Sequence, residues 1–442
     1  MNGTNCTNGT NGTNGRNEST SYPTGAAEVA TTYRRHVSRG RARLAGLTGG
    51  LVEVASDGAR VWDATGNEYL DCGGYGVFLL GHRHPAVIRA VVDQIQRHPM
   101  ATRLLLEPVA AHAAETLAQI TPPGLDYVHF VTSGAEATEA AIKLARANGR
   151  TSLVSTIGGY HGKTMGALSL TAREFYQAPF RPLLPGVRHV PFGDSTALAA
   201  VLGTVADCCV VVEPVQGEGG VVLPPAGYLR DVAALCRDHG ALLVVDEIQT
   251  GLGRLGRWWG ADADDVIPDI LLVGKNLSGG VIPVAAMVAT AATYAPFNRD
   301  PFLHTSTFAE APVAMAAAAA AVTTIRDEGL VERARVLGEQ LLAGIQDILH
   351  GTCPDLVVDV RGAGLLIGIE LADAQLAGEL VLEMIERGVL VNHSLNAHNV
   401  IRLTPPAVLT AADVDLVLTA VTGAAGALNE SHPHTTTLER SA

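Results

Sequence analysis

Between about residues 85 and 305, helical stretches alternate with short apolar segments, and this alternation constrains the fold more than any other feature of the chain. The segments expected to be strands are 127–131, 152–156, 209–213, 241–245 and 270–274. Strands joined by helices usually pair in parallel, because each helix carries the chain back to the same end of the sheet. The pattern therefore predicts an α/β fold whose large domain, residues 85–308, is built on a mostly parallel sheet.

The rest of the chain divides into four further parts. Residues 1–25 are rich in Asn, Gly and Thr and poor in large apolar groups, so we expect them to be disordered. Residues 26–84 form an N-terminal segment, in which turn signals and alternating apolar residues between 51 and 70 predict a small antiparallel meander that joins the small domain. Residues 309–428 are expected to form a smaller α+β C-terminal domain, followed by a flexible tail, 429–442.

Charge and cysteine content narrow the class of protein. The net charge of −13 disfavours nucleic acid and anionic membrane surfaces as partners, so the substrates should be small molecules. No apolar run reaches the roughly 18 residues of a membrane span, and no signal-peptide pattern is present, which predicts a cytoplasmic protein. The six cysteines show no metal-ligand spacing, so we expect reduced thiols and no metal site.

Two of the expected strands end on residues that can carry chemistry. The strand 241–245 runs into Asp246, and the strand 270–274 runs into Lys275, one of only three lysines in the chain with Lys143 and Lys163. In open parallel sheets the ligand crevice lies at the carboxyl ends of the strands. A strand-end aspartate can also simply cap a helix, but the two features together place an acid and an amine at one edge.

The stretch Ser133-Gly134-Ala135-Glu136 follows another expected strand and precedes an amphipathic helix. Its Ser-x-x-Glu spacing is typical of a capping box, which needs no ligand. A glycine at a helix start also exposes main-chain amides at the positive end of the helix dipole, where a phosphate is stabilised. Both interpretations remain open from these residues alone.

Residues 251–256, GLGRLG, match the dinucleotide fingerprint G-x-G-x-x-G. A functional match would indicate an NAD-dependent dehydrogenase. However, five residues separate the preceding strand from the first glycine, and no clear helix follows the last one. The context therefore disfavours this alternative.

A lysine, an acid and a phosphate anchor are what pyridoxal phosphate requires from a protein. Four segments stand in the order found in class III aminotransferases: TSGAEATE at 132–139, EPVQGEGG at 213–220, DEIQTG at 246–251, and Lys275 with GG at 279–280. The chain resembles this class from about residue 33 to 418. Within the class it resembles putrescine (diamine) aminotransferases most, through DCGGYG at 71–76, HGKT at 161–164 and LPGVRHVPFG at 184–193.

The resemblance implies a fold-type I pyridoxal-phosphate-dependent transferase with a seven-stranded sheet. It assigns the cofactor contacts to seven residues: Gly134, Ala135, Tyr160, Asp246, Gln249, Lys275 and Thr307. Lys275 would form the Schiff base and transfer the proton, Asp246 would pair with the pyridinium nitrogen, and Gln249 would meet the ring hydroxyl. Tyr160 would stack on the ring, and Thr307 would reach the phosphate of the other subunit of a homodimer with active sites at its interface. Core packing of Tyr160 and a loop hydrogen bond of Thr307 remain the alternatives.

The resemblance also indicates how substrates bind. Arg402 matches the family's carboxylate-binding arginine, and Glu218 matches the glutamate that pairs with it when the amine is bound; a surface ion pair is the alternative. Lys163 stands where amino-acid-specific relatives carry arginine, so it would contact substrate as a point charge without a bidentate fork. Ser278 and the stretch 309–312, AEAP, also depart from the family pattern, in loops that shape the pocket.

The leading hypothesis is an aminotransferase that moves an amino group between a terminal amine or its aldehyde, diamine-like or biosynthetic, and a keto acid such as 2-oxoglutarate or pyruvate. The two half-reactions would alternate in a ping-pong cycle. The alternatives on the same fold are an acetylornithine- or ornithine-type aminotransferase and an aminomutase.

Overall fold

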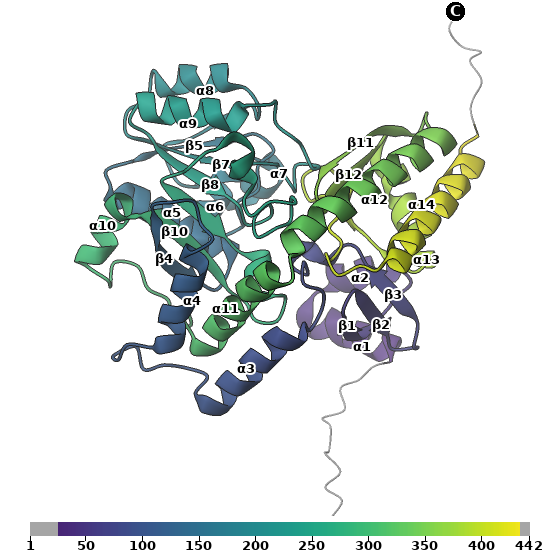
Figure 1. Ribbon diagram of the computed structural model, residues 1–442. Helices are drawn as coiled ribbons and strands as arrows, with labels where there is room; N and C mark the ends of the chain where they lie inside the picture. The colour runs from purple at the N-terminus through teal and green to yellow at the C-terminus, as the bar shows by residue number, and fades with distance from the viewer. Residues whose placement is uncertain (1–24, 434–442) are drawn as a thin grey trace, which may run out of the picture. The chain divides into compact units, whose positions relative to one another are not determined.

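The computed structural model describes residues 25–433 (Figure 1). The predicted disordered tail, apart from residue 25, and the end of the predicted C-terminal tail lie outside the described residues. The chain divides into two compact units, one running to Val54 with Asp63–Asn67, the other made of Ala55–Trp62 and the chain from Glu68. The first unit contains α1 (Ala26–Thr32), a π-helical turn (Tyr33–Val37) and α2 (Arg39–Leu47).

Seven strands form the sheet of the large domain, in the spatial order β4-β10-β9-β8-β7-β5-β6. Their bounds are β4 Leu125–Val131, β5 Ser152–Thr156, β6 Val187–Val190, β7 Cys208–Val212, β8 Leu242–Asp246, β9 Ile270–Val273 and β10 Ala285–Thr290. Strands β5 to β9 pair in parallel, while β10 runs antiparallel to both β4 and β9. The predicted mostly parallel seven-stranded sheet is confirmed.

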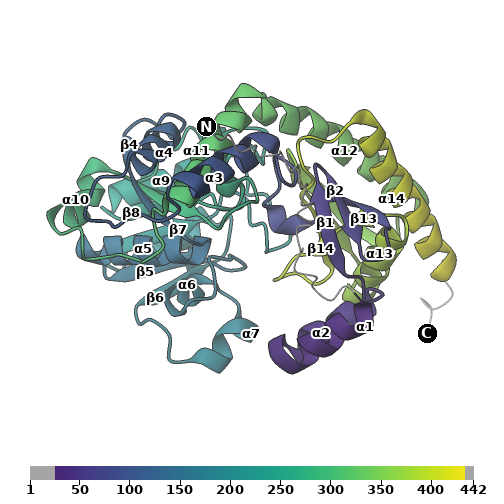
Figure 2. The same cartoon turned by 90° about the horizontal axis from the view of Figure 1, so that it is seen from below.

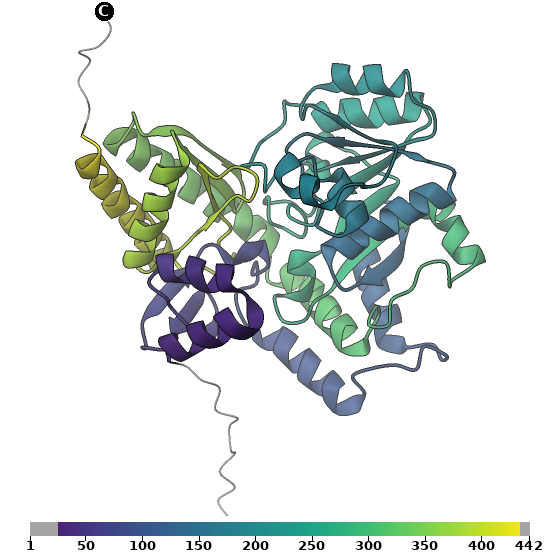
Figure 3. The same ribbon diagram turned by 180° about the vertical axis from the view of Figure 1, so that it is seen from behind.

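Helices cover both faces of this sheet, since neighbouring strand residues pack into two different apolar cores. In β7, Cys209 and Val211 belong to the core under α5 (Gly134–Ala147), α6 (Met165–Leu170) and α10 (Ala291–Arg299). Val210 and Val212 face the other core, with helices α3 (Pro85–Arg97), α4 (Pro108–Ala118), α8 (Ser195–Leu202), α9 (Tyr228–Asp238) and α11 (Pro312–Asp327). Helices α8 and α9 lie side by side (Figures 1 and 3). Burial on both faces is typical of parallel sheets and explains the uninterrupted apolar runs.

The carboxyl ends of four strands that run in the same direction bring polar residues to one edge of the sheet. Glu213 follows β7, Asp246 ends β8, Lys275 follows β9, and Ser133 follows β4. Parallel pairing therefore gathers residues that are far apart in the sequence. This edge is where the crevice of an open α/β sheet is expected.

A second, antiparallel sheet organises the smaller C-terminal domain, in the order β11-β12-β15-β14. The bounds are β11 Val357–Ala363, β12 Leu366–Leu371, β14 Asn392–His393 and β15 Val400–Leu403. Helices α12 (Leu330–Thr352), α13 (Ala374–Glu386) and α14 (Ala411–Ser431) gather around it (Figure 2). The predicted smaller domain is confirmed, although its boundaries with the neighbouring segments stay predictions.

A third sheet combines two distant parts of the chain. Its order is β1-β2-β3-β13, with β1 at Glu53–Asp57, β2 at Arg60–Asp63, β3 at Glu68–Asp71 and β13 at Val389–Leu390. Strand β13 pairs in parallel with β3, which ties the C-terminal region to the segment that precedes the large domain.

Helix α14 continues to Ser431, inside the stretch predicted to be a flexible tail. By length and composition alone it could cross a membrane. In the molecule 44% of its most apolar stretch is buried, and the helix packs on α12 and α13. Its apolar side thus covers the C-terminal sheet domain.

Candidate active site

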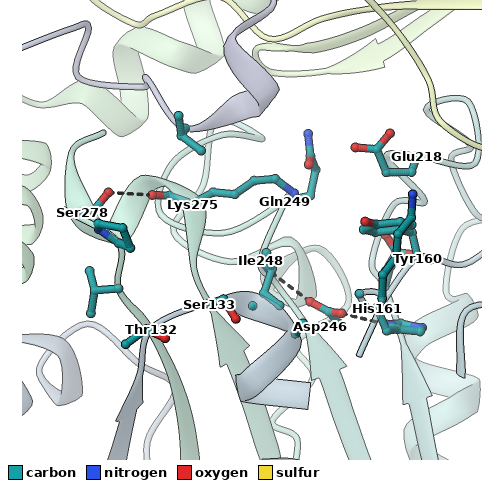
Figure 4. A pocket seen from close by; sticks show the side chains of 18 residues that line it. Thr132, Ser133, Tyr160, His161, Glu218, Asp246, Ile248, Gln249, Lys275 and Ser278 are labelled. Atoms are coloured by element: carbon teal, nitrogen blue, oxygen red, sulfur yellow. Dashed lines mark hydrogen bonds and ion pairs between the residues drawn. The ribbon is translucent and has the colours of Figure 1, made fainter. Parts of the chain in front are cut away.

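A cavity of about 350 Å³ opens at the carboxyl edge of the large sheet. Eight of the ten predicted site residues line it: Gly134, Ala135, Tyr160, Lys163, Glu218, Asp246, Gln249 and Lys275. Figure 4 shows Lys275 extending across the cavity toward Gln249, with Asp246 and His161 together on another side. The volume suits a small molecule.

The start of α5 presents free main-chain amides to this cavity. Ser133 Oγ accepts from the amide of Glu136, as a helix cap does, at 3.2 Å. The Glu136 carboxylate accepts from both the amide and the hydroxyl of Thr132, so the predicted reciprocal box closes on Thr132 instead of Ser133. A Cβ added at Gly134 would lie 2.8 Å from Ile248 Cδ1, which explains the glycine. The first-turn amides have no partner within the helix and can bind an anion.

Lys275 begins a 3-10 turn directly after β9 and has a φ of +42°, in the left-handed region. Burial lowers the pKa of its amine, and the positive charge of Arg402 lowers it further, while Glu218 opposes the shift. A lowered pKa leaves more of the amine neutral, and only the neutral amine can act as a nucleophile or a base. Such backbone strain persists where surrounding structure holds it, often at functional sites.

Asp246 pairs with His161, and both of these buried residues line the cavity. Asp246 Oδ2 lies 2.7 Å from His161 Nδ1, and Asp246 Oδ1 accepts from the amide of Ile248. Thr171 Oγ1 accepts from the His161 amide, and the Thr138 hydroxyl donates to the His161 carbonyl. Burial alone would lower the pKa of His161, but the hydrogen bond and charge of Asp246 outweigh it and raise the pKa. The raised pKa favours a positively charged imidazole beside the Asp246 carboxylate.

Gln249 is buried, yet neither atom of its side-chain amide has a hydrogen-bond partner within residues 25–433. Glycines approach it closely: a Cβ added at Gly76 would lie 2.9 Å from Gln249 Nε2, and one at Gly217 would lie 2.7 Å from Gln249 Cγ. Buried amides are nearly always hydrogen-bonded in proteins. The Gln249 side chain is therefore available to hydrogen-bond a polar group of a molecule bound in the cavity.

Glu218 and Arg402 form a second buried ion pair, between Glu218 Oε1 and Arg402 Nη1. Glu218 belongs to the loop after β7, and Arg402 belongs to β15 of the C-terminal sheet. The other carboxylate oxygen of Glu218 accepts from the Leu395 amide at 2.9 Å. Only 1% of Arg402 is exposed, which excludes the alternative of a surface ion pair. Its Nε makes no hydrogen bond to any described residue, so one donor remains for another acceptor.

Lys163 and Thr307 occupy different positions relative to the cavity. Lys163 Nζ lies 3.9 Å from the centre of the Tyr176 ring and 5.9 Å from that of Tyr160, which are cation–π distances. Thr307 is exposed and does not line the cavity of its own chain. The structure thus brings Lys163 to the site and leaves Thr307 outside it.

The sequence model of the family "Aminotransferase class-III" matches residues 49–424. The chain belongs to the class III aminotransferases. Its structure is similar to the ornithine aminotransferase from Toxoplasma gondii, with 35% identity, a TM-score of 0.82, and coverage of 87% of this chain and 92% of that one. It is also similar to an (S)-enantioselective omega-transaminase from Thermomicrobium roseum, with 29% identity, a TM-score of 0.84, and coverage of 92% and 100%.

The cofactor of this class III aminotransferase is pyridoxal phosphate. The Toxoplasma structure has partial occupancy of PLP at its active site. An omega-transaminase from Pseudomonas jessenii, 25% identical with a TM-score of 0.81 over 88% of this chain and 95% of that one, was solved in complex with PMP. The residues present fit this cofactor. The start of α5 has main-chain amides that can bind a phosphate, and the side-chain amide of Gln249, which has no partner among the described residues, can bind a polar group of the ring.

Two titratable residues that line the cavity, His161 and Glu213, were not among the predicted site residues. His161 has no local signal, because its partner Asp246 lies 85 positions away. Glu213 follows β7 and could have been found by the argument that identified Asp246 at the end of β8. Glu213 Oε2 accepts from the Tyr160 amide at 3.0 Å, and burial raises the pKa of Glu213 to about 7.

Proposed function

We propose that this enzyme transfers an amino group from a terminal amine, diamine-like or the amine of a biosynthetic aldehyde, to a keto acid such as 2-oxoglutarate or pyruvate. One observation carries the proposal: the cavity that holds Lys275 also adjoins a buried arginine, Arg402, whose counterion Glu218 leaves part of the guanidinium unbonded. A pocket with a neutralised arginine accepts an amine that lacks a carboxylate. The same pocket with the pair opened accepts an acid.

Pyridoxal phosphate, when bound, supplies the electron sink that removal of a proton next to a substrate nitrogen requires. The amides of Gly134 and Ala135 would bind its phosphate. The carboxylate of Asp246 would hold a proton on the ring nitrogen, supported by His161. The Lys275 amine, with its lowered pKa, would take up the substrate proton and return it.

Three further side chains orient the cofactor and the reactants. Gln249 would bond the ring hydroxyl with the amide that lacks a partner among the described residues. Tyr160, whose amide is fixed by Glu213, would stack on the ring. Lys163, seated on the Tyr176 ring, would place a single positive charge in the pocket. A point charge grips a carboxylate less specifically than an arginine fork, which favours donors without an α-carboxylate.

An ornithine- or acetylornithine-type activity is the second candidate, and the 35% identity with the Toxoplasma ornithine aminotransferase favours it. Ornithine also ends in a primary amine, so the two candidates differ in whether an α-carboxylate is recognised. Putrescine, which has no carboxylate, separates them. An aminomutase would need no keto acid acceptor.

We propose a homodimer with active sites at its interface. Thr307 is exposed and does not line the cavity of its own chain, as expected of a residue that serves the partner. Large apolar side chains are exposed in the same region: Leu104, Leu105, Leu106, Phe302 and Phe308. Arg103 joins the two segments through the Ser306 carbonyl. Clustered exposed apolar residues commonly mark an interface.

We also place the enzyme in the cytoplasm. Its five described cysteines, Cys72, Cys208, Cys209, Cys236 and Cys353, are free and buried. Free thiols suit a reducing compartment.

The test is spectroscopic. The visible absorption of the purified, cofactor-loaded enzyme should be bleached by putrescine or another terminal amine and restored by 2-oxoglutarate or pyruvate. Bleaching by ornithine but not by putrescine would select the second candidate. Failure of every amine to change the spectrum would contradict an aminotransferase cycle, and Lys275→Ala is the control that must not respond.

A further inference from the structure

The segment 251–256, GLGRLG, has no part in the contacts described so far, yet it contains one of the most deeply buried charges of the molecule. Arg254 is 0% exposed. Within residues 25–433 no ion pair joins it to a carboxylate, and its guanidinium donates only to main-chain carbonyls. A buried cation is costly unless polar groups replace its water. Its position therefore needs an explanation.

Arg254 closes the end of the ladder between β12 and β15. In this ladder Gly368 faces Arg402 and Ile367 faces Leu403. Continued by two residues, the same register sets Leu365 opposite Pro405. Proline has no amide hydrogen, so the ladder cannot continue and carbonyls are left without donors.

The guanidinium supplies the missing donors. Arg254 Nη1 lies 3.2 Å from the Leu365 carbonyl and 2.6 Å from the Pro405 carbonyl. The Arg254 carbonyl in turn accepts from the Leu365 amide at 2.9 Å. Gly364, with a φ of +52°, permits this approach, since a Cβ there would lie 2.4 Å from the carbonyl carbon of Leu255. The motif thus serves close packing of two main chains instead of a dinucleotide.

A third contact reaches the cavity wall. Arg254 Nη2 lies 3.5 Å from the carbonyl of Gly76, the glycine that packs on Gln249. Thr404, between Arg402 and Pro405, bonds the chain just before the turn that contains Gly76, because its amide donates to the Cys72 carbonyl at 2.7 Å. Burial, and then the charge of Arg402, lowers the pKa of Arg254 to about 9, so the group stays protonated at neutral pH.

We propose that Arg254 is a positioning residue for the acceptor half-reaction: it fixes the end of the β12–β15 ladder so that Arg402 keeps its aim when Glu218 releases it. The inference rests on the proposed function, in which Arg402 binds the carboxylate of the keto acid. While the ion pair is closed, both Glu218 and the strand β15 fix the position of Arg402. Once the pair opens, β15 alone fixes it, and this strand ends one residue later at Leu403. The amine half-reaction does not use the free arginine and should not depend on Arg254.

The chain offers a matched control in Arg333. Its guanidinium also donates to two carbonyls of the segment after β15, those of Ala407 and Leu409, but beyond the ladder end. Arg333→Gln therefore removes a similar clamp from the same segment without touching Leu365, Pro405 or Gly76. Arg254→Lys keeps the charge and part of the donors, whereas Arg254→Gln removes both.

The experiment measures the two half-reactions separately in the cofactor-loaded enzyme, and the Kd of glutarate, a dicarboxylate without the reactive carbonyl, by calorimetry. For Arg254→Gln we expect binding of both the keto acid and glutarate to weaken about tenfold or more, which is the scale of a misplaced binding group. The rate of the amine half-reaction should stay within about twofold of wild type. Arg254→Lys should restore part of the loss. Arg333→Gln should leave both half-reactions unchanged.

Equal losses in the two half-reactions of Arg254→Lys, or no loss in Arg254→Gln, would overturn the proposal. So would a failure of both variants to fold with bound cofactor, because the role of Arg254 would then be in folding. Arg402→Ala, measured alongside, separates this inference from the proposed function. If Arg402→Ala leaves the keto acid half-reaction intact, the proposed function is wrong. If Arg402→Ala impairs this half-reaction but the Arg254 variants leave it intact, only the positioning role of Arg254 is wrong.

Discussion

Two buried ion pairs lie at the active site, and they are built differently. The pair of His161 and Asp246 joins a loop to the last residue of β8 at the edge of one sheet, and the hydroxyls of Thr138 and Thr171 hold the histidine main chain on both sides. The pair of Glu218 and Arg402 joins a loop of the large sheet to a strand of the C-terminal sheet. The first pair is fixed by its surroundings, while the second depends on two separate frameworks.

The difference teaches that burial of charges does not define their role. A buried ion pair adds little stability in itself, since desolvation offsets the attraction. The His161–Asp246 pair holds a charge in one place, as a group that keeps a cofactor ring nitrogen protonated must. The Glu218–Arg402 pair leaves Nε of the guanidinium without a hydrogen bond among the described residues, as a group that changes partners must. Each variant below disturbs one side of this comparison.

Loss of Lys275 should have the largest effect, because this amine feels the charges of both pairs. Lys275→Ala should abolish transamination and the borohydride-reducible covalent adduct. Lys143→Arg is the matched control on α5: Lys143 contacts the Leu303 carbonyl outside the cavity, and both properties should stay nearly intact. Trapping followed by peptide mapping checks the assignment, and an adduct on Lys143 or Lys163 would refute it.

Neutralising the fixed pair should have the next largest effect. Asp246→Asn keeps the shape of the side chain but removes the charge that, in the proposed function, would hold a proton on the ring nitrogen. The rate should fall on the order of a thousandfold or more, equivalent to several kcal/mol of barrier, in both half-reactions. Stopped-flow measurement of each half-reaction tests this. Turnover like that of the wild type would remove Asp246 from its role.

Removing the movable counterion should have a smaller and selective effect. In Glu218→Ala, Arg402 stays positive in the amine half-reaction, so amino acids with an α-carboxylate should begin to compete as donors. The gain should be on the scale of a charge-assisted hydrogen bond, roughly 1.5–3 kcal/mol in their kcat/KM. Competition assays against putrescine measure it. An unchanged donor preference would mean that Glu218 does not gate the arginine.

The smallest effect should appear in the pH dependence of stability. Because the pKa of His161 is raised in the fold, its charge stabilises the protein fully below the unfolded value of about 6.5, and this contribution is lost as pH rises through the folded value. The unfolding free energy of wild type minus that of His161→Asn should therefore fall with rising pH. A difference that grows with pH would contradict the raised pKa.

The residues expected to contact the cofactor can be predicted from the sequence more readily than the complete sheet around them. Asp246 and Lys275 can be predicted because they follow apolar strands, and the parallel sheet then forces them to one edge. The strands β6 and β10 escape the same argument, since β6 is four residues long with two polar ones and β10 is an Ala-rich strand that runs antiparallel. Local pattern does not encode that direction.

The roles of His161 and Arg254 could not be predicted from the sequence because they depend on tertiary contacts. His161 matters because of a partner 85 positions away, and Arg254 because of carbonyls more than 100 positions away. Nothing in the residues around either one announces these partners. The GLGRLG motif shows the opposite error, since its spacing resembles a nucleotide loop while its glycines serve packing.

The proposed function depends on the Glu218–Arg402 pair opening in the keto acid half-reaction. Single-turnover kinetics of Arg402→Ala test this opening most directly. The amine half-reaction and the keto acid half-reaction are measured separately on the cofactor-loaded variant. We predict that binding of the keto acid weakens by roughly 2–3 kcal/mol equivalent, the scale of a charge-assisted bidentate contact, while the amine half-reaction scarcely changes. Equal losses in both half-reactions would show that Arg402 supports the fold or the cofactor, and the distinction between a fixed and a movable pair would be wrong.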